Sequence, residues 1–163
     1  MPIPTPTLDQ AIDAVVTELV TMPGGAAGTV LHWENNKDDE TETLEQYQDA
    51  ASGEIFVTFV SCAGTRKETG SAWNEDYEIY PIKARLVTLM LDEEEWDRHT
   101  LTRAQLMVNE LDKNTAVFRI GGQVPVNGTP ETAEIESHGF VSINDQRFFQ
   151  AVIAVEIEAR RWS

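Results

Sequence analysis

Residues 77–91, with the sequence YEIYPIKARLVTLML, decide the fold that we expect for this chain. Toward the end of this stretch apolar side chains occupy both alternating positions, which is typical of a β-strand covered on two faces. Asp92 then offers a helix N-cap, with Glu95 three residues later and acid where the helix dipole favours it. The sequence therefore predicts one long strand that runs directly into a helix.

An apolar stripe follows at helical spacing. Its members are Leu101, Ala104, Met107, Val108 and Leu111. Such a stripe has to lie against other apolar groups, and the sheet that contains the preceding strand is the expected partner.

Length and charge limit the possible classes of protein. The chain has 163 residues, enough for one domain (1–163) with a real core, and a formal net charge of −16. That charge would repel phosphate backbones and anionic membranes, so neither is an expected partner. The single cysteine, Cys62, excludes an internal disulfide and is interpreted as a small core residue. We find no signal peptide and no membrane-spanning stretch, which indicates assembly in a cytoplasm.

The N-terminal part is predicted to be an extended arm followed by a helix. Prolines alternate in residues 1–6, and this arm is either a frayed end or a segment that docks on a neighbouring subunit. A capping box begins at Thr7, apolar residues recur at helical spacing from Leu8 to Val20, and two glycines end the helix at 24–25.

Further strands are predicted at 29–33, 54–61, 115–120, 133–143 and 146–159. Residues 144–145 form a two-residue hairpin turn between the last two strands. The final strand alternates most regularly, so we expect it to lie inside the sheet.

Two polar segments interrupt this pattern. Residues 34–53 begin with a cluster of carboxylates, but the ligand alternation and the central glycine of a calcium loop are missing, which favours a solvated loop. Residues 62–76 are predicted to be the protruding tip of a hairpin. Arg66 and Lys67 place positive charge there, either as ordinary solvated charge or as a contact for an acidic neighbour.

The residue patterns of catalysis are absent from the sequence. His32, His99 and His138 fall in three separate predicted elements without metal-ligand spacing. No serine lies in a nucleophile elbow, and no glycine-rich loop matches a phosphate cradle. We therefore predict no catalytic residue, no metal site and no cofactor, and we do not expect an enzyme.

The order of elements resembles one protein family. Residues 136–157, which contain a strand, a tight acidic turn and a final alternating strand, resemble the end of tail-terminator (tail-completion) proteins of long-tailed bacteriophages. The resemblance covers most of the chain as an order of elements and contains no diagnostic short motif. This chain is longer than compact members of the family at 34–53 and 121–132.

The resemblance implies a structural virion protein that forms a ring, most often of six subunits, at the head–tail junction. Such a ring sits on the last ring of the tail tube, stops tube polymerisation and joins the tail to the head connector protein. DNA would pass through its negatively charged lumen without specific binding.

A ring interface requires apolar groups beyond those that the subunit core uses. Leu106 falls off the core stripe, and Trp73 and Trp96 are difficult to place inside the domain. Each tryptophan is either an exposed anchor at a subunit contact or a cap on the core edge. Arg66 and Lys67 are candidates for reaching the tube or an adjoining subunit.

Taken together, the sequence predicts an α+β domain with a mixed or antiparallel sheet of about five to six strands and two main helices packed on it. The alternatives to a terminator ring are a head-completion or neck protein, a tail-tube subunit and, in another class, a small acidic metal- or ligand-binding enzyme domain.

Overall fold

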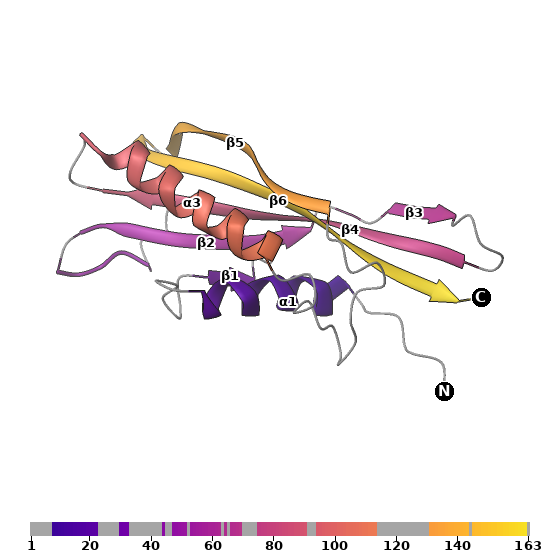
Figure 1. Ribbon diagram of the computed structural model, residues 1–163. Coiled ribbons are helices and arrows are strands. Elements are labelled where there is room, and N and C mark those ends of the chain that lie inside the picture. Colours follow the sequence, from indigo (N-terminus) through magenta and orange to yellow (C-terminus); the bar gives the residue numbers. More distant parts are fainter. Residues whose placement is uncertain are drawn as a thin grey trace.

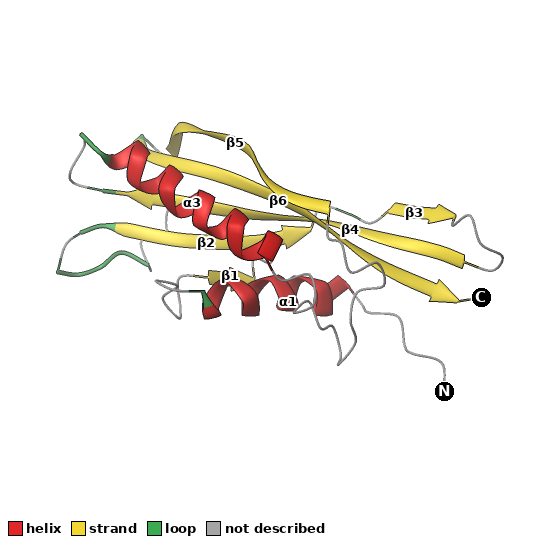
Figure 2. Cartoon of the chain, viewed as in Figure 1, coloured by secondary structure: helices red, strands yellow, loops and turns green. Residues whose placement is uncertain are grey.

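The computed structural model shows two helices packed on a β-sheet (Figures 1 and 2). It describes residues 8–22, 30–32, 44, 47–51, 53–62, 64, 66–69, 75–90, 94–113, 131–143 and 145–162. The elements are α1 (Leu8–Thr21), β1 (Val30–His32), β2 (Ile55–Cys62), β3 (Arg66–Thr69), β4 (Glu75–Leu89), α3 (Trp96–Lys113), β5 (Glu131–Ile143) and β6 (Gln146–Trp162).

The sheet is mixed, with strand order β1-β2-β4-β6-β5. Its body consists of four antiparallel strands, β2, β4, β6 and β5. β1 adds a parallel strand beside β2, and β3 pairs with β4 outside the main order. The predicted α+β class with two helices is confirmed. The predicted set of five to six strands matches only in part, because β3 was expected to be loop and the strand expected at 115–120 lies outside the described residues.

Both helices pack on one face of the sheet, where they form the main core. The stripe predicted for α3 is confirmed, with Ala104, Met107, Val108 and Leu111 buried and Leu101 partly buried. The prediction for β6 is also confirmed, because the strand lies between β4 and β5. Its inward residues are all buried, namely Phe149, Ala151, Ile153, Val155 and Ile157.

The described residues form an apolar cover at one end of the opposite face of the sheet. A second apolar cluster there joins residues of β2, β4 and β6 to Leu44 and Tyr47. Farther along this face Lys83, Arg85 and Val152 are only partly buried. In the described part of the chain, no helix packs on that side.

Helix α3 begins later than the sequence predicted. The carbonyl of Glu95 accepts the first helical hydrogen bond, from the amide of His99 at 2.8 Å, so Asp92 is not the N-cap. Trp96, the first residue of the helix, is held to β4 by the hydrogen bond from its indole N–H to Thr88.

The hairpin of β2 and β4 is confirmed, with Ile55 opposite Leu89 and Cys62 opposite Ile82. The segment expected to be its polar tip differs from the prediction, because β3 forms a strand there on β4. β4 also extends beyond the part that pairs with β2, and its first residues pair with the end of β6. We call residues 66–69, 75–79 and 158–162 the strand extension. It projects past both helices, at the right of Figure 1.

Several predictions fall on segments outside the described residues. They are the arm at 1–6, most of the acidic segment at 34–53, Trp73, and residues 121–130 of the region at 121–132, whose last two residues begin β5.

Candidate self-association surfaces

Trp96, one of the two tryptophans proposed as exposed anchors, is buried within the subunit. It is 3% exposed and lies in the first turn of α3 against β4 and β5. Of the two interpretations that the sequence left open, an exposed subunit contact is therefore excluded for this residue. An indole can be buried in this way because its N–H finds an acceptor inside the fold.

That acceptor belongs to a closed chain of hydrogen bonds. The Trp96 Nε1–H donates to Thr88 Oγ1 at 2.9 Å, and Thr100 Oγ1 donates to the Trp96 carbonyl at 3.0 Å. The two threonine hydroxyls lie 2.7 Å apart. When the proton of Thr100 is used on the carbonyl, the Thr88 hydroxyl can donate to Thr100 or, at 3.4 Å, to the Phe149 carbonyl. Every donor is then satisfied, and the first turn of α3 is fixed to the sheet.

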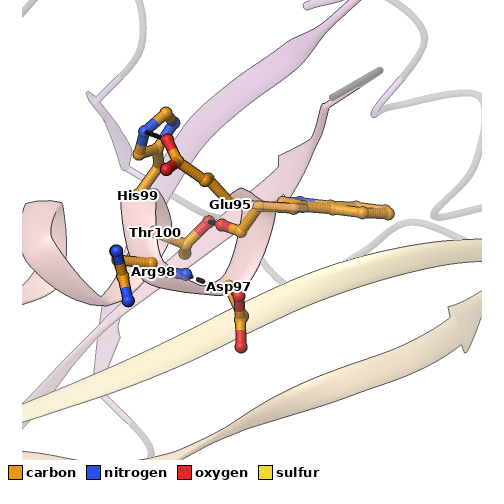
Figure 3. Close-up of polar contacts among 6 residues, drawn as sticks. Glu95, Asp97, Arg98, His99 and Thr100 are labelled. Carbon is orange, nitrogen blue, oxygen red and sulfur yellow. Dashed lines mark hydrogen bonds and ion pairs between the residues drawn. The ribbon is translucent and has the colours of Figure 1, made fainter. Parts of the chain in front are cut away.

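The outer side of the same turn is polar (Figure 3). His99 Nε2 lies 3.1 Å from Glu95 Oε2, a contact that is an ion pair when the imidazole is protonated, and each side chain is about half exposed. Asp97 Oδ1 accepts the backbone N–H of Arg98 at 2.8 Å. Exposed pairs of this kind contribute little to stability, so this turn is a solvated rim and not a buried charge site.

Sequence reasoning missed the aromatic residue that is exposed beside this turn, Phe140 on β5. Its side chain is 40% exposed, while its ring packs edge-on against Trp96 and Phe149, with ring centroids 5.1 Å and 4.9 Å apart. The guanidinium carbon of Arg147 lies 3.8 Å from the Phe140 ring centroid. The sequence signal that could have indicated this contact is the register of the final hairpin, which sets Phe140 opposite Phe149.

Leu106 is exposed, as its position off the core stripe predicted. Its side chain is 48% exposed on α3, and Leu106 and Phe140 are the two large apolar side chains that are exposed among the described residues. One turn away, the guanidinium of Arg103 lies over the Phe56 ring at 5.8 Å, and partial burial lowers the pKa of Arg103 from its ordinary value. An isolated exposed leucine is common on monomers, so its interface role remains a prediction.

Arg66 and Lys67 open strand β3 in the strand extension. They lie opposite Ile79 and Glu78 of β4 in the register. The end of β6 brings two further basic residues to the other side of β4, with Arg160 opposite Tyr77 and Arg161 opposite Asp76. The structure thus places four of the chain's twelve basic residues on the two strands that flank the start of β4.

The open face of the sheet carries an ion pair. Lys83 Nζ on β4 lies 2.9 Å from Glu136 Oε2 on β5, and both side chains are more than two-fifths exposed. Glu136 lies at a register shift between Ile135 and Ser137, where β5 bulges against β6. Arg85 on the same face lies over the Phe59 ring at 5.3 Å. This face is polar and partly solvated.

The described residues hold no group of three metal-binding side chains. His32 lies on β1, His99 on α3 and His138 on β5, and the ring of His138 stacks on Phe149 with centroids 6.3 Å apart. The buried hydroxyls of Thr88 and Thr100 are occupied by the chain of hydrogen bonds described above. What the described surface offers is contact area: an exposed leucine, an exposed phenylalanine and projecting strands.

No protein family model matches this chain, and no curated protein matches it significantly in sequence. Among the described helices, none combines the length and the apolar character needed to cross a membrane.

Proposed function

We propose that this chain is a structural virion protein that associates with copies of itself into a ring at the head–tail junction of a long-tailed bacteriophage. The ring caps the tail tube, stops its polymerisation and joins the tail to the head connector. The proposal combines the order of elements, which resembles that of tail terminators, with the surfaces described above.

The observation that carries the proposal is the strand extension. β3, the start of β4 and the end of β6 continue past the two helices (Figure 1). A short ribbon of strands is marginal in isolation, because it has little hydrophobic core of its own. Contact with a neighbouring subunit gives a physical reason for such a length.

Charge supports the same proposal. The chain carries a formal net charge of −16, and the strand extension combines four basic residues with five acidic ones. The basic residues are Arg66, Lys67, Arg160 and Arg161, and the acidic ones are Glu68, Glu75, Asp76, Glu78 and Glu158. Charges of both signs on a contact surface steer two copies into one orientation. Elsewhere the acidic surface suits a lumen that DNA passes without adhering to it.

The test is electron microscopy of the purified chain mixed with headless tails of the phage that encodes it. We expect one ring on the head-proximal end of each tail, and tails with the ring should no longer lengthen when tube protein is added. Rings that stack without limit would support a tail-tube subunit instead. Binding only to completed heads would support a neck protein, and an absence of binding to either would contradict the whole proposal.

A further inference from the structure

Strand β5 has two halves of different character. Residues 131–136 contain three glutamates and both register shifts against β6, whereas residues 137–143 pair with β6 in continuous register. The second half, which we call the regular half of β5, carries no aspartate, glutamate, lysine or arginine. Charges and bulges are the usual means of protecting a sheet edge from pairing, so only the first half is protected.

The regular half of β5 is also an open edge. β5 is the last strand in the sheet order, and among the described residues no strand pairs with its outer side. Alternate residues of such a strand direct their N–H and C=O groups away from the sheet. Phe140, with a 40% exposed side chain, lies in its centre, and Ser137 and Ser142 are exposed near its two ends. This edge has the backbone groups and the apolar contact that an added strand requires.

The sequence of residues 1–7, MPIPTPT, contains a segment that matches this edge. It has no charged side chain, and its prolines occupy positions 2, 4 and 6. Consecutive residues of an extended chain direct their N–H groups to opposite edges, and proline has none. One edge of this segment therefore keeps its donors at Ile3 and Thr5, while the other edge lacks them. Such a segment can add to a sheet only as its final strand.

The acceptor edge and the start of α1 lie on opposite sides of the sheet. α1 packs at the β1–β2 side, and β5 is three strands beyond β2 (Figure 1). That separation is roughly 14–19 Å at the usual strand spacing. Seven extended residues reach roughly 25 Å at most, so the arm would be largely used up in crossing its own subunit. The reach of the arm therefore favours another copy of the chain as the donor.

We infer that residues 2–7 of one copy add as a terminal strand to the regular half of β5 of the next copy. This inference rests on the proposed self-association and specifies its interface. Because donor and acceptor lie at opposite edges, the contact is head-to-tail, which is the geometry that closes into rings. The prolines then prevent a further strand from adding at the same place.

The direct test is a cross-link with a short bismaleimide in a Cys62→Ser background. Thr5→Cys is combined with Ser137→Cys or with Ser142→Cys. One of the two combinations then brings two cysteines together whether the arm pairs nearer the start or nearer the end of the regular half of β5. We expect a ladder of covalent oligomers on a denaturing gel. Thr5→Cys with Thr17→Cys, on the exposed side of α1, is the matched control and should show no covalent oligomers. A band that is linked within one chain, or no cross-link above the control, would overturn the inference.

A second measurement separates this inference from the proposed function. We expect deletion of residues 2–6, and also Ser142→Lys, to weaken self-association by about tenfold or more, because a lysine protects an edge strand. Thr17→Lys on the exposed side of α1 adds the same charge and should leave self-association unchanged. If the full chain associates and both edge variants associate as strongly as it does, the arm exchange is wrong, while the proposal of a ring is unaffected. If the full chain is monomeric, the ring itself is wrong.

Discussion

At the scale of single residues, the chain of hydrogen bonds among Trp96, Thr88 and Thr100 has the clearest energetic consequence. All three residues are buried, and each hydroxyl or N–H proton has an acceptor within reach. We expect Thr88→Val, which keeps the shape and removes the hydroxyl, to lower the free energy of unfolding by about 1–3 kcal/mol, because it leaves the buried indole N–H of Trp96 without its acceptor. Urea unfolding followed by circular dichroism measures this effect.

A double-mutant cycle identifies the cause of that loss. Trp96→Phe removes the donor of the hydrogen bond whose acceptor Thr88→Val removes, so the two changes together should cost less than the sum of the single changes. Thr102→Val on the exposed side of α3 should stay within about 0.5 kcal/mol of the wild type. Additive effects in the cycle would show that Thr88 and Trp96 stabilise the fold independently.

Cys62 gives a pH-dependent prediction. Its side chain is partly buried against the main core, and this burial raises the pKa of the thiol above its ordinary value, opposed in part by a backbone hydrogen bond at Gly64. The reactive thiolate is therefore scarcer in the native protein than in the unfolded one. We expect a thiol reagent to modify native Cys62 more slowly than a model thiol at pH 8, with the rate recovering in urea. Equal rates in native and unfolded protein would contradict the burial.

Residue patterns predicted the exposure of Leu106 but not the burial of Trp96. The helical period alone places Leu106 off the core stripe. The burial of Trp96 depends on Thr88, which lies on the preceding strand, and this pairing is a tertiary contact that no local spacing reveals. Phe140 was missed for the same reason, because its exposure depends on β5 being the edge of the sheet.

At the scale of elements, the β5–β6 hairpin depends on Asp145. Its φ of 65° lies in the left-handed region, which aspartate tolerates and β-branched residues do not. We expect Asp145→Gly to change the unfolding free energy by a few tenths of a kcal/mol at most, and Asp145→Val to lower it by about 1–2 kcal/mol. Thermal unfolding of the two variants tests this, and an equal stability of both would contradict a strained turn.

The elements themselves were largely predictable. β4, α3 and β6 carry long apolar patterns, and the structure confirms them. The boundary of α3 was wrong because the acidic residues before it resemble a cap, while the ring of Trp96 fixes the actual start. β3 was missed because its four residues are polar, and it is a strand through its pairing with β4 rather than through its own propensity.

At the scale of the whole molecule, surface residues should affect association and leave the fold intact. Leu106 is exposed and belongs to neither apolar cluster of the described residues. If it is a subunit contact, Leu106→Lys should weaken self-association by about tenfold or more while the unfolding free energy stays within about 0.5 kcal/mol. Thr17→Lys is again the control. An unchanged association would remove Leu106 from the interface.

The most direct test of self-association is the mass of the purified full chain in solution, measured by light scattering behind a sizing column over a range of concentrations. The account predicts one discrete species, a small ring of defined copy number that neither grows with concentration nor forms tubes. A mass of 18.2 kDa at every concentration, with and without tails, would contradict it.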